Sequence, residues 1–128
     1  MMDIELLIKQ VMDCAMTVRR KLMPGYLEKI YENALVIELT KAGLLAEQQH
    51  SLEVIYDGQV IGHYIPDIMV ENCLILEIKA VEHLLGTHEA QLVSYLTTTG
   101  IENGLLINYG NPDKIQIKRK YRTFRQKN

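Results

Sequence analysis

A short string in the middle of the chain, Pro66-Asp67 separated by nine residues from Glu77-Ile78-Lys79, constrains the fold more than any other feature. Apolar, strand-like residues flank both halves of the string. Charged side chains in such segments must share one face of a sheet, because side chains alternate between the two faces of a strand. The string therefore predicts two adjacent β-strands that bring two carboxylates and one amine together, which is the minimal equipment for metal-assisted phosphodiester hydrolysis.

The loop between the two predicted strands sets their register. If Asp67 lies opposite Glu77 in an antiparallel pair, residues 71–73 form the connecting loop, and Asn72 suits a left-handed backbone there. Period-two alternation then places Lys79 on the same face as Glu77, and the neighbouring apolar residues in the opposite layer. Charges thus interrupt an otherwise buried strand.

Two carboxylates about 4 Å apart repel each other by roughly 4 kcal/mol at an effective dielectric constant of about 20. Neighbouring carboxylates on a half-buried sheet therefore need a cation or a shared proton. A divalent metal ion bound by Asp67 and Glu77 would supply the cation. The alternative is that Glu77 and Lys79 form an ion pair at an exposed sheet edge, while Asp67 starts a turn after Pro66. The string alone leaves both interpretations open.

The rest of the chain predicts an α/β fold with the element order α-α-β-β-β-α-β. The expected elements are helix 3–22, helix 26–41, strands 51–56, 59–70 and 73–81, helix 87–99 and strand 104–109. Asp57-Gly58 forms the expected two-residue turn between the first two strands. The last strand should lie parallel to the third, because a helix makes a right-handed crossover between them. We expect a three-layer α/β/α fold, with a mixed central β-sheet and helices on both faces.

The predicted helix 87–99 contributes two further candidate site residues. Helical spacing places Gln91 and Tyr95 on one face, one turn apart, next to core leucines. A lone tyrosine on such a face usually packs in the core with its hydroxyl bonded. A glutamine and a tyrosine that follow a strand carrying Glu77 and Lys79 form a less ordinary combination, so we include both.

The composition is typical of one globular domain. The chain has 128 residues, of which 48% are hydrophobic and 23% charged, enough for a real core in a single domain spanning residues 1–128. Cys14 and Cys73 lie far apart in the sequence, and no signal-peptide pattern or apolar run of membrane length occurs. We therefore expect a cytoplasmic protein with reduced thiols and no membrane partner.

Charge is distributed unevenly along the chain. The formal net charge is only −2, yet all 16 acidic residues lie at or before Asp113, and residues 114–128 hold seven of the 14 basic ones. A basic C-terminal segment, residues 114–128, could neutralise several phosphates. The candidate nucleic-acid contacts in it are Lys118, Arg119, Lys120 and Arg122. The alternative is a solvated or partly disordered C-terminus.

Four motifs occur in an order that is typical of a known family. They are Gly25-x-x-Glu28-x-x-Tyr31, the string around Pro66, residues 88–96 and residues 104–110. With these motifs the chain resembles the GxxExxY protein family over about residues 10–120. That family is similar to the PD-(D/E)xK nuclease superfamily, which has a restriction-endonuclease-like fold. The chain departs from the usual family pattern at Arg19 and Met23, where the family commonly has His and Gly.

The resemblance implies a divalent metal site beside a catalytic lysine. The implied ligands of Mg²⁺ or Mn²⁺ are the carboxylates of Asp67 and Glu77, the main-chain carbonyl of Ile78 and, directly or through water, the carboxylate of Glu28. Lys79 would position or deprotonate the attacking water, or stabilise charge that develops on the phosphate. Gln91 and Tyr95 would orient Lys79 or contact a phosphate. The implied catalytic residues are thus Lys79, Asp67, Glu77, Gln91 and Tyr95.

The expected function is that of a metal-dependent nuclease, which hydrolyses the phosphodiester bonds of DNA or RNA, with DNA the favoured partner. The alternative is a nuclease-fold module with little or no turnover that binds nucleic acid or a protein partner. The clustered carboxylates favour the enzyme, since a pure binding module has no need of carboxylates that face a polyanion. A homodimer would suit a small domain that cuts one strand at a time.

Overall fold

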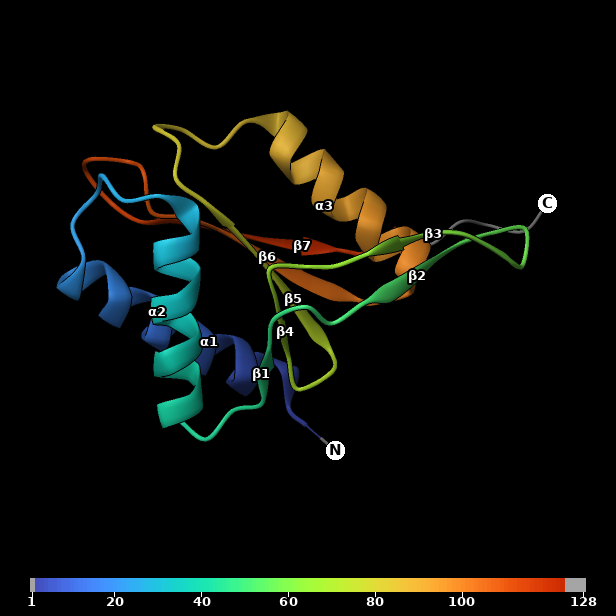
Figure 1. Ribbon diagram of the computed structural model, residues 1–128, viewed down its shortest axis with the longest axis horizontal. Helices are drawn as coiled ribbons and strands as arrows, with labels where there is room; N and C mark the ends of the chain where they lie inside the picture. Colours follow the sequence, from blue (N-terminus) through green and yellow to red (C-terminus); the bar gives the residue numbers. More distant parts are fainter. Residues whose placement is uncertain (1, 124–128) are drawn as a thin grey trace.

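The structure is a computed structural model that describes residues 2–123 of the chain. Within that range three helices and seven strands follow one another: α1 (Ile4–Lys21), α2 (Glu28–Lys41), β1 (Ala46–Glu47), β2 (Leu52–Tyr56), β3 (Gln59–Tyr64), β4 (Ile68–Val70), β5 (Leu74–Lys79), α3 (Gly86–Thr99), β6 (Asn103–Asn108) and β7 (Gln116–Tyr121). Five strands form a mixed sheet in the order β1-β4-β5-β6-β7, and β2 and β3 form a separate hairpin. Helices α1 and α2 cover one face of the sheet and α3 covers the other (Figure 1), so the expected α/β fold is confirmed.

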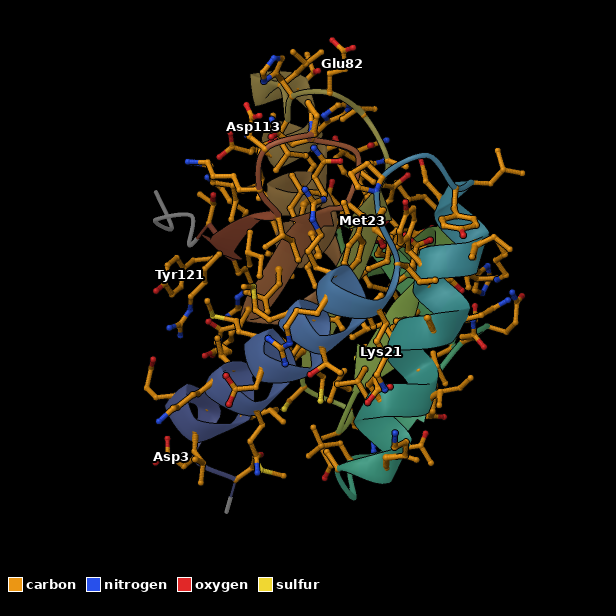
Figure 2. The ribbon with its side chains drawn as sticks, turned by 90° about the vertical axis from the view of Figure 1, so that its left-hand side faces the viewer. Asp3, Lys21, Met23, Glu82, Asp113 and Tyr121 are labelled. Carbon is orange, nitrogen blue, oxygen red and sulfur yellow. The ribbon has the colours of Figure 1, made fainter. Side chains whose placement is uncertain are left out.

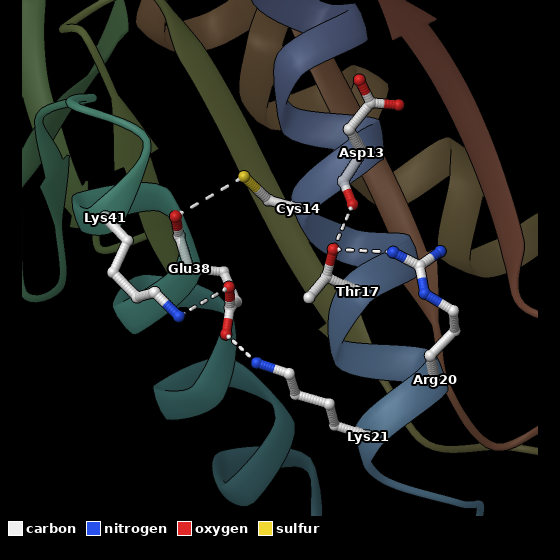
Figure 3. Close-up of polar contacts among 7 residues, drawn as sticks. All are labelled: Asp13, Cys14, Thr17, Arg20, Lys21, Glu38 and Lys41. Atoms are coloured by element: carbon white, nitrogen blue, oxygen red, sulfur yellow. Dashed lines mark hydrogen bonds and ion pairs between the residues drawn. The ribbon is translucent and has the colours of Figure 1, made fainter.

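Helices α1 and α2 pack against each other on one face of the sheet. Asp3 caps α1, because its carboxylate accepts a hydrogen bond from the amide of Glu5 at 3.0 Å. Between the helices, Glu38 of α2 binds Lys21 of α1 at 3.3 Å and Lys41 of its own helix at 3.5 Å (Figure 3). The two helices therefore form a joined support for the residues at the start of α2.

Strand β5 lies at the centre of the sheet and separates two cores. Its residues Leu76 and Ile78 pack with α1 and α2, whereas Ile75 packs with α3. Glu77 and Lys79 continue the face of Ile75, since side chains alternate along a strand. The predicted division of this strand into an apolar face and a charged face is confirmed.

The register of β4 and β5 also agrees with the prediction. The two strands are antiparallel with Val70 opposite Leu74, and the same register places Asp67 opposite Glu77. In the connecting loop Asn72 has a φ of 56°, the left-handed conformation expected for it. Strand β6 runs parallel to β5, as the crossover through α3 predicts.

The predicted strand 59–70 is wrong as a single element. β3 ends before Pro66 and β4 begins after it, because proline has no amide hydrogen to donate to a sheet. β2 and β3 therefore form a hairpin that packs against α3, and the predicted strand 51–56 and residues 59–65 of the predicted strand 59–70 do not join the central sheet. The turn of the hairpin follows the prediction, since Asp57 and Gly58 have φ values of 50° and 73°.

The sequence pattern does not predict the two edge strands, β1 and β7. β1 is a two-residue strand that pairs with β4, and β7 pairs antiparallel with β6 at the other edge of the sheet. The basic C-terminal segment is therefore part of the sheet as far as Tyr121, which corrects the expectation of a solvated arm for this part (Figure 2). Residues 124–128 of the segment lie outside the described residues.

The segment that follows Lys79 is fixed by the end of β6. Asn108 accepts a hydrogen bond from the amide of Val81 at 2.9 Å and donates one to its carbonyl at 2.8 Å. Gly110 packs directly on this segment, because a Cβ at that position would lie 2.4 Å from the amide nitrogen of Val81. Figure 2 marks this end of the molecule with Glu82. The position of Lys79 is thus defined by contacts on both sides of it.

Candidate active site

Asp67 and Glu77 are held next to each other by hydrogen bonds to the backbone of both strands. The amide of Asp67 donates to Glu77 Oε1 at 3.1 Å, and the amide of Ile78 donates to Asp67 Oδ2 at 2.7 Å. The hydroxyl of Tyr64, the last residue of β3, donates a short hydrogen bond to the same Glu77 Oε1. One oxygen of each carboxylate is therefore already occupied.

This arrangement places excess negative charge at a partly buried position. Burial, and then the charge of Asp67, raise the pKa of Glu77 to about 7, although hydrogen bonds from Tyr64 and from the amide of Asp67 oppose the rise. Burial also raises the pKa of Asp67, with a further contribution from the charges of Glu32 and Glu28. Within residues 2–123 neither carboxylate forms an ion pair. At neutral pH the pair therefore retains part of a proton unless a cation takes its place.

Glu28 and Glu32 approach the pair from α2. They lie four residues apart and hence on one face of the helix. Glu28 begins α2 and is exposed, whereas Glu32 is only 6% exposed and its Oε2 binds Lys29 at 2.8 Å and Gln48 at 2.6 Å. No three His, Cys, Asp or Glu side chains in the described part of the chain are arranged to hold a metal ion. That Glu28 completes a metal site with the other two carboxylates stays a prediction.

A pocket of about 260 Å³ opens beside Glu77 on the α3 side of the sheet. Its lining residues come from β3, β5, β6 and α3: Tyr64, Glu77, Lys79, His88, Gln91, Leu92, Tyr95 and Leu106. The rings of Tyr64 and Tyr95 stack with their centroids 3.8 Å apart and their planes inclined by 7°. The structure thus brings the sequence candidates Glu77, Lys79, Gln91 and Tyr95 to one pocket, and Asp67 is bonded to its wall.

Lys79 enters this pocket without a fixed partner. Its ammonium group makes no hydrogen bond or ion pair with another described residue, yet its charge opposes the rise in the pKa of both carboxylates. β5 is the third of five strands, so the alternative of a Glu77 and Lys79 ion pair at an exposed sheet edge is wrong. A lysine in this position is available to act on a bound substrate.

The remaining carboxylate oxygens fit a small divalent cation. Glu77 Oε2 and Asp67 Oδ1 accept no hydrogen bond from any residue that the structure describes. They belong to carboxylates whose pKa is raised by burial and neighbouring negative charge. A bound cation would offset the cost of ionising them at this position. Mg²⁺ is commonly held by one or two carboxylates, with waters and substrate phosphates completing its octahedral shell. Asp67 and Glu77 meet that requirement, while Glu28 and the carbonyl of Ile78 stay predicted ligands.

The four basic candidates lie on β7 or directly after it. Three of them form ion pairs with acidic residues elsewhere in the fold: Arg119 with Glu5 at 2.8 Å, Lys120 with Glu89 at 2.9 Å and Arg122 with Glu102 at 3.8 Å. Lys118 is exposed and forms no ion pair with another residue between 2 and 123. Three of the four candidates therefore bind β7 and the residue after it to other parts of the domain.

The Gly-x-x-Glu-x-x-Tyr motif shapes the connection between α1 and α2. Gly25 has a φ of 126°, a conformation that side chains disfavour. Tyr31 is fully buried, and its hydroxyl donates to the carbonyl of Met23 at 2.7 Å and accepts from the amide of Tyr26 at 3.2 Å. Tyr31 is thus a packing residue, and the motif sets the point at which Glu28 starts α2.

Two residues near the carboxylates, Tyr64 and Glu32, are not predicted from the sequence. The signal for Glu32 was its spacing of four residues from Glu28, which places both on one helix face. The signal for Tyr64 was Pro66, because a proline interrupts a strand. The residues before it can then leave the sheet and approach the carboxylates from the side of α3.

A family model described as the PD-(D/E)XK nuclease superfamily matches residues 5–120 of the chain. A comparison with curated proteins gives no match. Among solved structures, the chain is similar to the one titled "Crystal structure of SSO0001", with 23% sequence identity and a TM-score of 0.58. The likeness covers 76% of this chain and 50% of that chain, so the chain spans about half the length of that structure, and it supports the fold alone.

None of the helices that the structure describes is long and apolar enough to cross a membrane. The family match extends over nearly the whole described range and includes the string with Asp67, Glu77 and Lys79. The fold places Glu77 and Lys79 at one pocket beside the central strand of a mixed sheet, and the amide of Asp67 is bonded to Glu77. The chain therefore belongs to the PD-(D/E)XK nuclease superfamily.

Proposed function

We propose that the chain is a metal-dependent nuclease of the GxxExxY type that hydrolyses phosphodiester bonds. The observation that carries the proposal is the pair of Asp67 and Glu77, two partly buried carboxylates that are fixed side by side. No opposing charge is bonded to them within the described residues. A protein that used them only for packing would gain nothing from such a pair, whereas a bound cation relieves its cost.

Asp67 Oδ1 and Glu77 Oε2 are the proposed primary ligands for Mg²⁺ or Mn²⁺. The carboxylate of Glu28 and the main-chain carbonyl of Ile78 are proposed to complete the protein's share, directly or through water. When bound, such an ion supplies positive charge that polarises the scissile phosphate and lowers the pKa of a water molecule. The hydrogen bonds from Tyr64 and two amides hold both carboxylates in place before a substrate arrives.

Lys79 is the proposed catalytic residue that acts on the water or the phosphate. Lys79 lines the same pocket as Glu77. In this position it can hold the attacking water, transfer a proton, or stabilise negative charge on the phosphate. Gln91 and Tyr95 line the pocket as well, and their amide and hydroxyl groups are proposed to orient Lys79 or contact a phosphate oxygen.

DNA is the proposed substrate ahead of RNA. Lys118 is exposed on β7 and is proposed to contact the phosphate backbone. Arg119, Lys120 and Arg122 would join it by exchanging their carboxylate partners for phosphates. A homodimer is proposed because a domain with one carboxylate pair cuts one strand at a time.

The test is incubation of the full chain with single-stranded, double-stranded and branched DNA and RNA, in Mg²⁺, in Mn²⁺ and in EDTA. We expect cleavage of at least one substrate with metal and none in EDTA. Glu77→Gln, purified in parallel, should be inactive and controls for contaminating nucleases. Binding without cleavage in either metal would instead identify a binding module with a nuclease fold. If the chain neither binds nor cleaves any of these substrates, both proposals are contradicted.

A further inference from the structure

The two oxygens of the Glu77 carboxylate are in different states. Oε1 accepts two hydrogen bonds, one from the hydroxyl of Tyr64 and one from the amide of Asp67 at 3.1 Å. Oε2 accepts none from residues 2–123. A carboxylate oxygen has two lone pairs. Oε1 therefore has none left for a cation, whereas Oε2 has both.

This difference restricts how Glu77 can bind a metal ion. With Oε1 saturated, Glu77 can offer only one oxygen. Mg²⁺ needs a near-octahedral shell and is satisfied by single carboxylate oxygens and waters, whereas Ca²⁺ takes roughly six to eight oxygens and often uses both oxygens of one carboxylate. A carboxylate that is limited to one oxygen therefore favours the smaller ion.

The hydroxyl that imposes this limit is itself held in position. The ring of Tyr64 stacks on Tyr95 at a centroid distance of 3.8 Å and packs against the core between α3 and the sheet. A phenol keeps its proton at neutral pH, so the hydroxyl acts as a donor toward Glu77 Oε1. The hairpin thus presents one fixed donor to one carboxylate oxygen.

We propose that Tyr64 is a positioning residue that limits Glu77 to one-oxygen coordination and thereby selects Mg²⁺ over Ca²⁺ at this site. The inference rests on the proposed metal-dependent function, and it assigns the choice of metal to a residue outside the Pro66 to Lys79 string. No bond is made or broken by Tyr64 in the reaction. Its contribution is the direction in which Glu77 presents its free oxygen.

The test is the ratio of Mg²⁺ to Ca²⁺ affinity, measured by isothermal titration calorimetry on the full chain. Tyr64→Phe removes the hydroxyl and keeps the ring that stacks on Tyr95. Groups that bond to a metal ligand typically contribute about 10- to 100-fold to metal affinity. We expect Mg²⁺ affinity to fall and Ca²⁺ affinity to hold or rise, so that the preference for Mg²⁺ narrows by about tenfold or more. Tyr56→Phe, at an exposed tyrosine of the same hairpin, should keep the parent ratio.

If Tyr64→Phe has the same ratio of Mg²⁺ to Ca²⁺ affinity as the parent, the inference is wrong. The ratio is the chosen measure because a general loss of stability weakens the binding of both cations alike. If circular dichroism shows that Tyr64→Phe does not fold, Tyr95→Leu replaces it. That variant removes the stack behind the hydroxyl, and the ratio should narrow in the same direction. An unchanged ratio there overturns the inference equally.

Glu77→Gln separates this inference from the proposed function. Absence of metal binding in the parent, or equal binding by the parent and Glu77→Gln, contradicts the proposed metal site and the role of Tyr64 with it. Binding that is lost in Glu77→Gln, together with an unchanged ratio in Tyr64→Phe, contradicts the role of Tyr64 alone.

Discussion

In the described part of the chain, most charged side chains along β7 have ionic partners, whereas the pair formed by Asp67 and Glu77 has none. Along β7 and directly after it, three basic side chains each form an ion pair with a carboxylate elsewhere in the fold: Arg119, Lys120 and Arg122. Asp67 and Glu77 instead lie beside each other and form no ion pair with any described residue. Burial is the main cause that raises the pKa of both carboxyls, and neighbouring negative charge adds to it.

The difference separates charges that hold the fold together from charges that are available for chemistry. An exposed ion pair typically stabilises a protein by about 0 to 1 kcal/mol, and in β7 that gain is already realised. Two partly buried carboxylates cost free energy until they bind a proton or a cation, so a fold that keeps them points to a ligand. Lys79 belongs with the available charges, since it too has no partner among the residues described.

Lys79→Ala should have the largest effect of any substitution at the site. We expect cleavage to slow by about 10²-fold or more, because the ammonium group acts on the water or the phosphate, while Mn²⁺ binding is largely preserved. Single-turnover cleavage followed on a gel gives the rate. Lys9→Ala, the same change at an exposed lysine of α1, should cut at the parent rate. Equal rates for the two variants would contradict the assignment of Lys79.

Divalent metal should stabilise the folded protein through the carboxylate pair. A ligand that binds only the folded state adds about 2.7 kcal/mol at roughly one hundred times its Kd, which raises the Tm by several degrees. Asp67→Ala and Glu77→Ala should lose most of this response, and they should raise the Tm in EDTA by relieving the repulsion. Thermal melts in Mn²⁺, Mg²⁺ and EDTA measure both effects.

Glu53→Ala, at an exposed position of β2, is the control for these melts and should respond to metal as the parent does. A parent that shows no shift with metal is melted again with nucleic acid present, because substrate phosphates can complete the site. If metal still has no effect, or if the carboxylate variants respond like Glu53→Ala, the pair does not bind metal.

The stability of the metal-free protein should depend on the protonation of Glu77. Because folding raises the pKa of Glu77 from its ordinary value of 4.5 to about 7, the folded protein binds more protons than the unfolded chain between these values. Its contribution to stability is therefore complete below pH 4.5 and is lost as the pH rises through about 7. The loss should be on the order of 3 kcal/mol. Asp67, whose pKa is also raised, acts in the same direction.

Urea unfolding in EDTA at several pH values tests this dependence. Glu77→Gln should flatten the profile between pH 4.5 and about 7. The difference between parent and variant is the informative quantity, because carboxyls such as Glu5 and Glu38, whose pKa is lowered by ion pairs, act in the opposite direction in both proteins. Parallel profiles would mean that Glu77 titrates like an exposed carboxyl.

Substitutions of Lys118 and Lys120 should have the smallest effect, a change in the salt dependence of DNA binding. They also compare a basic residue that has no acidic partner among the described residues with one that has such a partner. Both lie on β7, two residues apart, but only Lys120 is held by an acidic partner, Glu89. Lys118→Ala should reduce the slope of log K against log salt by roughly 0.9 for duplex DNA, the value of one phosphate contact. Lys120→Ala should reduce it less. Fluorescence anisotropy across a range of salt gives the slopes, and no change for Lys118→Ala would remove β7 from the proposed interface.

The part of the fold that could be predicted from the sequence is the part with local determinants. A three-residue loop and the period of two are enough to place Asp67 opposite Glu77 and to turn Lys79 to the same face. Helical spacing likewise brings Gln91 and Tyr95 to one pocket. In each case the residues that decide the geometry lie within a few positions of the residues concerned.

The parts that were not predicted depend on distant neighbours. Tyr64 reaches Glu77 only because Pro66 ends β3 and the hairpin then packs on α3, which the sequence of the strand does not specify. β7 resembles a charged tail because it is an edge strand, and edge strands commonly carry basic residues that prevent further pairing. Its Ile117 packs against the core, but alternation with so many charges obscures that signal.

The amide hydrogens of Asp67 and Ile78 point at the two carboxylates and make them visible to spectroscopy. A hydrogen bond to an ionised carboxylate is shorter and stronger than one to a neutral group, so each amide senses the charge of its acceptor. In an isotopically labelled sample their two resonances should shift together when acid or Mg²⁺ is added. The chain thus contains its own indicator of whether the pair holds a proton or a cation, and reading it requires neither a substrate nor a turnover.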